Sequence, residues 1–95
     1  MTVYVDDMYL TPLGQFGRMK MSHMIADSTE ELMAMADRVG IDRRWLQNAG
    51  THREHFDISS GKRAIAIRHG AVEVTMRQLG KMIRERRSRK EQTDA

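Results

Sequence analysis

The sequence has no cysteine, so disulfide cross-links, thiolate metal sites and cysteine nucleophiles are excluded. It also lacks an apolar run of the roughly 20 residues that a membrane-spanning helix needs. The chain opens with MTVYVDD, which is acidic from the start and has no signal-peptide core. We therefore expect a cytoplasmic protein with no membrane partner.

The composition of the chain is typical of a globular protein. Apolar residues make up 40 % and charged residues 31 % of the 95 residues, and this length suits one small domain. No repeat or linker divides the sequence. We expect a single α/β domain over residues 1–90, followed by a frayed C-terminal tail over residues 91–95.

Strand and helix signals alternate along the chain. Capping residues predict three helices. The first begins after Asp27 or Ser28, with Glu30 or Glu31 as the capping-box partner, the second after Ser59 or Ser60, and the third after Thr75. Short β-branched or alternating runs predict strands at residues 3–5, 21–25, 43–47 and 71–75, with loops at 8–21 and 52–57. This order predicts an α/β fold with a small, three- to four-stranded, mostly parallel sheet and about three helices packed on it.

The helix after Ser28 has the clearest pattern. Its apolar residues follow the spacing of an amphipathic helix, and Gly40 stands where such a helix usually ends. They are Leu32, Met35, Ala36 and Val39. The only tryptophan, Trp45, is assigned to the core, because a lone tryptophan is more often buried than stacked on a base or sugar.

Polar side chains gather near the ends of the expected strands. Asp6 and Asp7 follow the first strand, His23 lies in the second, and His55 and Asp57 precede the second helix. In open parallel sheets, ligands bind beyond the carboxyl ends of the strands. We therefore expect these side chains to converge at one edge of the sheet. The same edge should carry Asp27 after the second strand, Gln47 at the end of the third, and His52 and Arg53 in the loop before the second helix. Turn-forming aspartates and surface histidines would give the same pattern.

Two basic residues, Lys62 and Arg63, open the second helix. Helix N-termini attract phosphate through free backbone N–H groups, and the two cations would strengthen that attraction. An ordinary capped helix with exposed basic side chains explains the same residues equally well.

The C-terminal end of the chain is basic, since residues 76–95 carry seven basic and three acidic side chains. Nucleic acid is one candidate partner for this segment. The residues that would contact it are Arg84, Arg86, Arg87, Arg89 and Lys90. A solvated helix end is the favoured interpretation, because acidic residues interrupt the run and no aromatic residue lies nearby.

Several short motifs stand in order along most of the chain. They are Tyr4-Val5-Asp6-Asp7, Ser22-His23 before Asp27, Glu30-Glu31-Leu32, Trp45 with Gln47, His55-Phe56-Asp57, Lys62-Arg63-Ala64, and Gly70-Ala71-Val72 running to Val74-Thr75. In these motifs the chain resembles the family catalogued as domain of unknown function 4031, short proteins of bacteria and phages. The resemblance carries no activity, but it implies that the polar candidates belong to the family's pattern. These ligand-binding candidates are Asp6, Asp7, His23, His55, Asp57, Lys62 and Arg63.

We expect a small-ligand binding protein for a phosphorylated or nucleotide-like molecule, without a cofactor or bound metal. In a phage setting such a protein could sequester a signalling nucleotide. Lys62 and Arg63 would hold the phosphate, and the imidazole and carboxylate side chains would hydrogen-bond the sugar or base. The alternative is a metal-dependent phosphoester hydrolase with Asp6, Asp7, His55 and Asp57 as ligands, and the second alternative is nucleic-acid binding. The nine methionines are compatible with a homo-oligomer.

Overall fold

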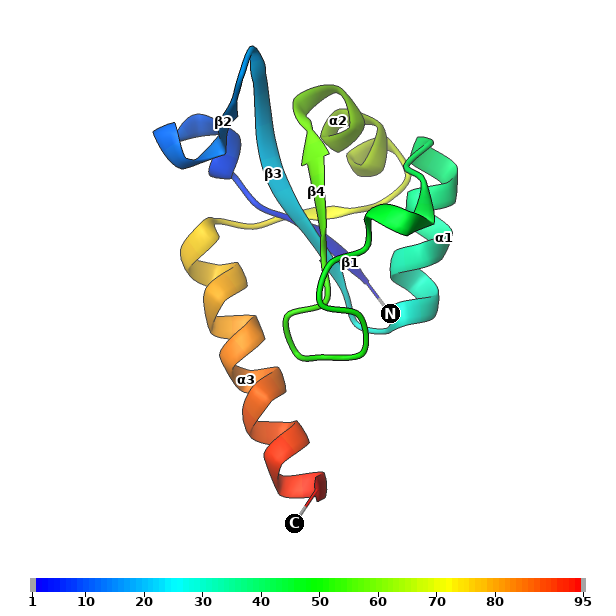
Figure 1. Ribbon diagram of the computed structural model, residues 1–95, viewed down its shortest axis with the longest axis vertical. Helices are drawn as coiled ribbons and strands as arrows, with labels where there is room; N and C mark the ends of the chain where they lie inside the picture. Colours follow the sequence, from blue (N-terminus) through cyan, green and yellow to red (C-terminus); the bar gives the residue numbers. More distant parts are fainter. Residues whose placement is uncertain (1, 95) are drawn as a thin grey trace.

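The computed structural model describes residues 2–94, with side chains as far as Arg89. Three short 3-10 helices lie in the connections, at Met8–Leu10, Pro12–Gly14 and Arg43–Trp45. The longer elements are β1 (Val3–Val5), β2 (Gln15–Phe16), β3 (Met19–Ala26), α1 (Thr29–Val39), β4 (Phe56–Ser59), α2 (Ser60–Arg68), β5 (Val72–Glu73) and α3 (Met76–Asp94) (Figure 1). Three helices packed on a five-stranded sheet confirm the predicted α/β fold.

The sheet is mixed, whereas a mostly parallel sheet was expected. β3 runs through its centre and pairs antiparallel with β1, β2 and β4. Only β1 and β5 pair in parallel. Parallel neighbours need a long crossover connection, whereas the chain turns directly from β2 into β3 and so forms an antiparallel hairpin. The sequence pattern predicts where strands lie, but it does not predict whether two paired strands run parallel or antiparallel.

The hydrophobic core lies between one face of the sheet and the helices α1 and α2. Met24 of β3 is fully buried there beside Phe56 of β4, together with Leu32 of α1 and Ala66 of α2. Because side chains alternate along a strand, the neighbours of Met24 point to the opposite face of the sheet. α3 stands on the other side of the molecule from α1 and α2 (Figure 1).

The predicted helix ends are confirmed. The Ser28 hydroxyl accepts a hydrogen bond from the Glu31 N–H at 3.2 Å, and Gly40 ends α1 with a left-handed φ of 78°. At the start of α3, Gln78 N–H donates to the Thr75 hydroxyl at 3.1 Å, and Thr75 N–H donates to the Gln78 side chain at 2.7 Å.

Three predictions about the segment between α1 and α2 were wrong, among them the strand at 43–47. Residues 43–45 form a 3-10 helix instead of a strand, because the Asp42 side chain accepts a hydrogen bond from Arg44 N–H and closes a turn. Trp45 at the end of this turn is 61 % exposed and does not enter the core. The expected loop at 52–57 ends in strand β4, whose Phe56 and Ile58 are buried with Asp57 exposed between them. The alternation covers only four residues and ends at Ser59, the cap of α2, so the sequence pattern did not reveal a strand.

The segment before β2 packs closely on β3. A Cβ added at Gly14 would lie 2.4 Å from the Met8 carbonyl oxygen and 2.6 Å from that of Met21. No side chain fits there, so this glycine sets how near the segment comes to β3.

The expected division of the chain into a domain and a frayed C-terminal tail is not tested. α3 continues to Asp94 along the described backbone, and the division into a domain at 1–90 and a frayed tail at 91–95 stays a prediction. Among the residues that the structure describes, no helix is long and apolar enough to cross a membrane.

Candidate functional site

Four polar side chains form what we call the His–Asp cluster: Asp6, His23, His55 and Asp57. His23 of β3 lies directly opposite Asp57 of β4 in the sheet register. Both residues alternate with core residues, so their side chains lie on the face opposite α1 and α2. Asp6 follows β1, and an isolated β-bridge to Gln47 places His55 just before β4. Three neighbouring strands therefore build one cluster.

Asp6 fixes the orientation and the tautomer of His23. The Asp6 side chain is 1 % exposed, and its Oδ1 accepts hydrogen bonds from the N–H groups of His23 (2.9 Å) and Met8 (3.2 Å). Its Oδ2 lies 2.7 Å from His23 Nδ1. Burial raises the pKa of Asp6, but these hydrogen bonds outweigh it and hold the pKa below its ordinary value. An ionised Asp6 keeps the proton on His23 Nδ1, so Nε2 of the neutral ring carries a lone pair.

His55 is oriented by a backbone acceptor. Its Nδ1 donates to the Arg53 carbonyl oxygen at 2.6 Å, and its Nε2 lies 3.4 Å from Asp57 Oδ1. The other carboxylate oxygen of Asp57 accepts a hydrogen bond from the Gln47 amide at 2.6 Å. Hydrogen bonding to Asp57 raises the pKa of His55, and the same bond lowers the pKa of Asp57. The apo cluster therefore favours a proton between these two side chains.

Three donor atoms of the cluster face one another. His23 Nε2 lies 3.9 Å from Asp57 Oδ1, and the rings of His23 and His55 meet edge to face at 5.4 Å between centroids. One donor atom from each of His23, His55 and Asp57 lies within 4.8 Å of the others. Once the proton between His55 and Asp57 is released, the two Nε2 lone pairs and a carboxylate oxygen face one another, an arrangement that a metal cation would stabilise in place of the proton. Two imidazoles and a carboxylate suit Zn²⁺ and similar divalent ions.

The surroundings of these three side chains fit a metal centre as well. Metal-binding histidines usually donate their second ring N–H to a carboxylate or a backbone carbonyl, which fixes the ring. His23 donates to Asp6, and His55 donates to the carbonyl of Arg53. Gln47 holds the remaining oxygen of Asp57. The three side chains could therefore bind an ion with little rearrangement.

The other three predicted site residues lie away from the cluster. Asp7 Oδ1 accepts a hydrogen bond from Met76 N–H at 2.8 Å, so this side chain caps α3. Lys62 Nζ donates to the Gly40 carbonyl at the end of α1, at 3.3 Å. Neither contributes to a common anion site with the histidines.

Arg63 is buried behind the cluster instead of facing a ligand. Its Nε donates to the Asp6 carbonyl oxygen at 2.8 Å, and its guanidinium donates to Glu73 at 3.2 Å. The same guanidinium lies over the Tyr9 ring, 4.6 Å from the centroid. Arg63 thus ties α2 to β1 and β5 and holds the backbone of Asp6 in place.

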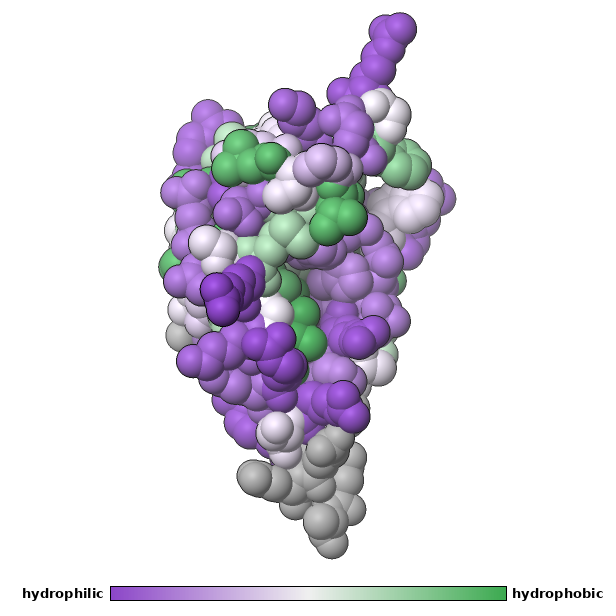
Figure 2. All heavy atoms as spheres, turned by 90° about the vertical axis from the view of Figure 1, so that its left-hand side faces the viewer, coloured by the Kyte–Doolittle hydropathy of each residue, from purple (hydrophilic) through white to green (hydrophobic). Residues whose placement is uncertain are grey.

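An apolar cleft of about 670 Å³ opens beside the cluster. One wall comes from the β2–β3 hairpin, and the other from the 3-10 helix Arg43–Trp45 and the residues after it. Figure 2, which looks onto the side that carries β2 and α3, shows hydrophobic side chains among hydrophilic ones. We call this feature the apolar cleft; its lining includes Phe16, Met19, Met21, Trp45, Leu46 and Asp57.

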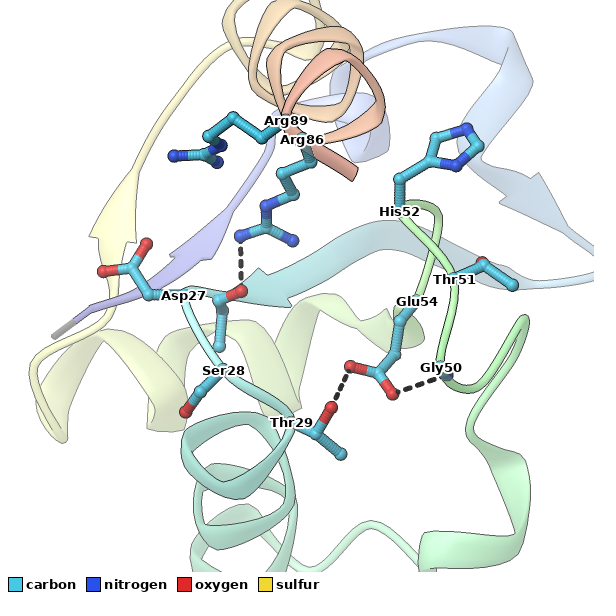
Figure 3. A pocket seen from close by; sticks show the side chains of 10 residues that line it. Asp27, Ser28, Thr29, Gly50, Thr51, His52, Glu54, Arg86 and Arg89 are labelled. Carbon is cyan, nitrogen blue, oxygen red and sulfur yellow. Dashed lines mark hydrogen bonds between the residues drawn. The ribbon is translucent and has the colours of Figure 1, made fainter. Parts of the chain in front are cut away.

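A second cleft, of about 540 Å³, lies between the N-terminus of α1, the loop before β4, and α3 (Figure 3). Its polar groups bind one another: Glu54 accepts hydrogen bonds from the Thr29 hydroxyl and from Gly50 N–H, and Arg86 donates to the Ala26 carbonyl. None of the His–Asp cluster lines this cleft. Its groups therefore join α3 to the body of the fold.

The hydrogen bond from Arg86 to the Ala26 carbonyl bears on the hypothesis that the C-terminal helix binds nucleic acid. Arg86 is turned toward the sheet and partly buried, and burial lowers the pKa of its guanidinium. Arg84, Arg87 and Arg89 are exposed on α3, and the side chain of Lys90 lies outside the described residues. A nucleic-acid partner for this segment stays a prediction.

Gln47 was expected among the polar groups at the sheet edge, and it does hold Asp57 there, although it does not end a strand as predicted. The feature that sequence reasoning missed is the exposed Trp45, which was assigned to the core. The signal that could have revealed it is the polar turn between two apolar segments, which places Trp45 at the surface.

The family model described as "Protein of unknown function (DUF4031)" matches residues 3–86, a span that contains the whole His–Asp cluster and the apolar cleft. No curated protein and no solved structure gives a significant match.

Proposed function

We propose that this chain, which belongs to the DUF4031 family, binds a divalent metal ion through His23, His55 and Asp57 and acts as a phosphoester hydrolase. The observation that carries the proposal is the meeting of two imidazole Nε2 atoms and one carboxylate oxygen whose partners on the far side are already fixed. This ligand set differs from the one expected from the sequence, since His23 replaces Asp7 and Asp6 supports a ligand instead of being one.

The charge of the cluster favours a phosphorylated ligand only when the ion is present. Asp6 and Asp57 are both ionised near neutral pH, because hydrogen bonds hold their pKa values down. Without a cation they repel a phosphate group. A divalent ion cancels these two negative charges and presents its own positive charge to the phosphate.

The remaining groups have supporting roles. Three protein ligands leave a coordination position open, and an ion held there can polarise a phosphoryl oxygen and lower the pKa of a bound water molecule. Asp6 keeps His23 in the tautomer that presents Nε2, and Gln47 keeps Asp57 turned toward the histidines. Apolar walls beside the cluster provide room for the rest of the ligand.

Calorimetric titration of metal-stripped protein with Zn²⁺ tests the metal site. One ion per chain should bind, and His23→Ala, His55→Ala or Asp57→Asn should each weaken binding more than about 100-fold, beyond the effect of losing an outer contact. The chain's other histidines provide matched controls, and His52→Ala and His69→Ala should bind as the unmodified protein does. Equal affinity in all five variants would remove the proposed site.

Hydrolysis of p-nitrophenyl phosphate tests the activity. The protein should release p-nitrophenol with Zn²⁺ or Mn²⁺ and lose this activity after chelation or after the Asp57→Asn change. If the metal-loaded protein releases no p-nitrophenol, the proposed hydrolase activity is wrong and only metal binding remains.

Binding without turnover is the second candidate function. The observation that favours it is the engagement of both carboxylates: Asp6 accepts three hydrogen bonds, and Asp57 is shared between His55 and Gln47. Neither carboxylate is free to act as a general base. In a cytoplasmic, phage-encoded protein such a site would sequester a signalling nucleotide, and the ligand would then be recovered unchanged after incubation with metal-loaded protein.

A further inference from the structure

We propose that the apolar cleft binds a flat heteroaromatic ring, such as a nucleobase, whose attached phosphate reaches the His–Asp cluster. The inference rests on the proposed function, because it assigns the rest of the ligand to the same site.

Three of the six large apolar side chains that are exposed among the described residues line this cleft. Trp45 is 61 % exposed, Phe16 is 74 % exposed, and Met19 is 48 % exposed, and all three line this one cleft. A small domain that leaves aromatic side chains in water on both walls of one cleft has a surface suited to binding. Rings and thioethers offer flat, polarizable contacts for another ring.

Continuity with the cluster decides which ligand fits. Asp57 lines the apolar cleft and also belongs to the three donor side chains. Gln47, another residue of the cleft, donates to Asp57 at 2.6 Å. A ligand that fills the cleft therefore ends at the cluster, so its apolar part and its anionic part must be joined in one molecule.

Arg44 adds positive charge to the same wall. Its guanidinium lies over the Trp45 ring, 5.0 Å from the centroid, and it lines the cleft. A stacked arginine and tryptophan form a flat cationic surface, which suits an aromatic ring that carries a phosphate. The volume of about 670 Å³ lies within the usual range for small-molecule sites.

Trp45 is the only tryptophan, so its fluorescence reports directly on the cleft. We would titrate metal-loaded protein with AMP, with ribose 5-phosphate and with adenosine. AMP should quench the fluorescence and bind about tenfold more tightly than ribose 5-phosphate, as expected for one base stacked on an aromatic side chain. Equal affinity for the two phosphates would overturn the proposal.

Calorimetry on the Trp45→Ala variant isolates the contribution of the ring. This variant should bind AMP no better than ribose 5-phosphate while its affinity for Zn²⁺ stays unchanged, and Trp45→Phe should restore most of the preference. Leu10→Ala is the matched control, because Leu10 is 69 % exposed but lies outside the cleft. A preference for AMP that survives Trp45→Ala would contradict the proposal.

Two further outcomes separate this proposal from the proposed function. If adenosine binds through Trp45 but neither Zn²⁺ nor phosphate binds, the aromatic subsite stands and the metal function fails. If sedimentation shows a dimer that Trp45→Ala dissociates, the cleft is an interface between two copies of the chain, and the aromatic subsite is wrong.

Discussion

Asp6 determines what the neighbouring histidine can do. It is a buried carboxylate whose charge is stabilised by three hydrogen bonds, two from backbone N–H groups and one from His23 Nδ1. The orientation of His23 therefore depends on a carboxylate that is itself buried.

Asp6→Asn should weaken Zn²⁺ binding about 10- to 100-fold, the usual effect of losing a partner that orients a metal-binding histidine. The asparagine amide can donate to His23 Nδ1, which would move the ring proton to Nε2, the atom that should bind the metal. Loss of hydrogen bonds to a charged group should also destabilise the fold by about 1.5–3 kcal/mol, measured by urea unfolding. Asp7→Asn is the control and should leave the metal affinity unchanged.

The pH dependence of the metal-free protein should show two opposite contributions. The pKa of His55 is raised by its hydrogen bond to Asp57, so its stabilisation is fully present below its ordinary value of 6.5 and is lost as the pH rises through the raised pKa. The pKa values of Asp6 and Asp57 are lowered, so their stabilisation is present above the ordinary value of 3.8 and is lost on acidification through the lowered pKa values.

NMR titration of the imidazole signals tests this directly. In Asp57→Asn the pKa of His55 should fall toward its ordinary value, since its main hydrogen-bond partner no longer carries a charge. A pKa of His55 that does not change in this variant would show that the two side chains are not coupled.

At the scale of helices and strands, the sequence predicted where helices begin but not which strands pair. Helix starts were predictable because a capping serine and its partner lie three residues apart, as at Ser28 and Glu31. Strand partners were not, because pairing of His23 with Asp57 joins positions 34 apart and depends on the whole sheet. The convergence of Asp6, His23 and His55 was expected from an incorrect parallel sheet, and it arises instead from antiparallel neighbours of β3.

α3 is attached partly through a cap that no local pattern reveals. Asp7 accepts a hydrogen bond from Met76 N–H, across 69 positions of the chain. Asp7→Ala should destabilise the protein by about 1 kcal/mol, a typical loss for a helix cap. The melting temperature should fall by about 4–8 °C in a domain of this size. Calorimetric scanning would measure this, and an unchanged melting temperature would show that the capping box at Thr75 suffices alone.

At the scale of the whole molecule, the two faces of the sheet have different roles. One face packs on α1 and α2 and forms the core, while the other carries the His–Asp cluster and, farther along, contacts α3. Sequence reasoning could find the core, because apolar periodicity is local. It could not find the apolar cleft, whose walls come from residues 16–21 and 44–47 and meet only in the folded chain.

Metal binding should therefore stabilise the entire fold, because the unfolded chain does not bring three strands together. Free Zn²⁺ at 100 times its dissociation constant should add about 2.7 kcal/mol and raise the melting temperature by about 10–20 °C. The His23→Ala variant should show no such rise. If neither Zn²⁺ nor a chelator changes the melting temperature of the unmodified protein, the proposed metal site is wrong.

Gly14 makes this arrangement sensitive to a change in a residue that has no side chain. Since no side chain fits between it and the carbonyls of Met8 and Met21, even an alanine would have to push the hairpin outward. Phe16 would then move away from Trp45, and the apolar cleft would widen beside Asp57. One added methyl group at this glycine should thus weaken the proposed binding of a flat ring while leaving the proposed metal site unchanged.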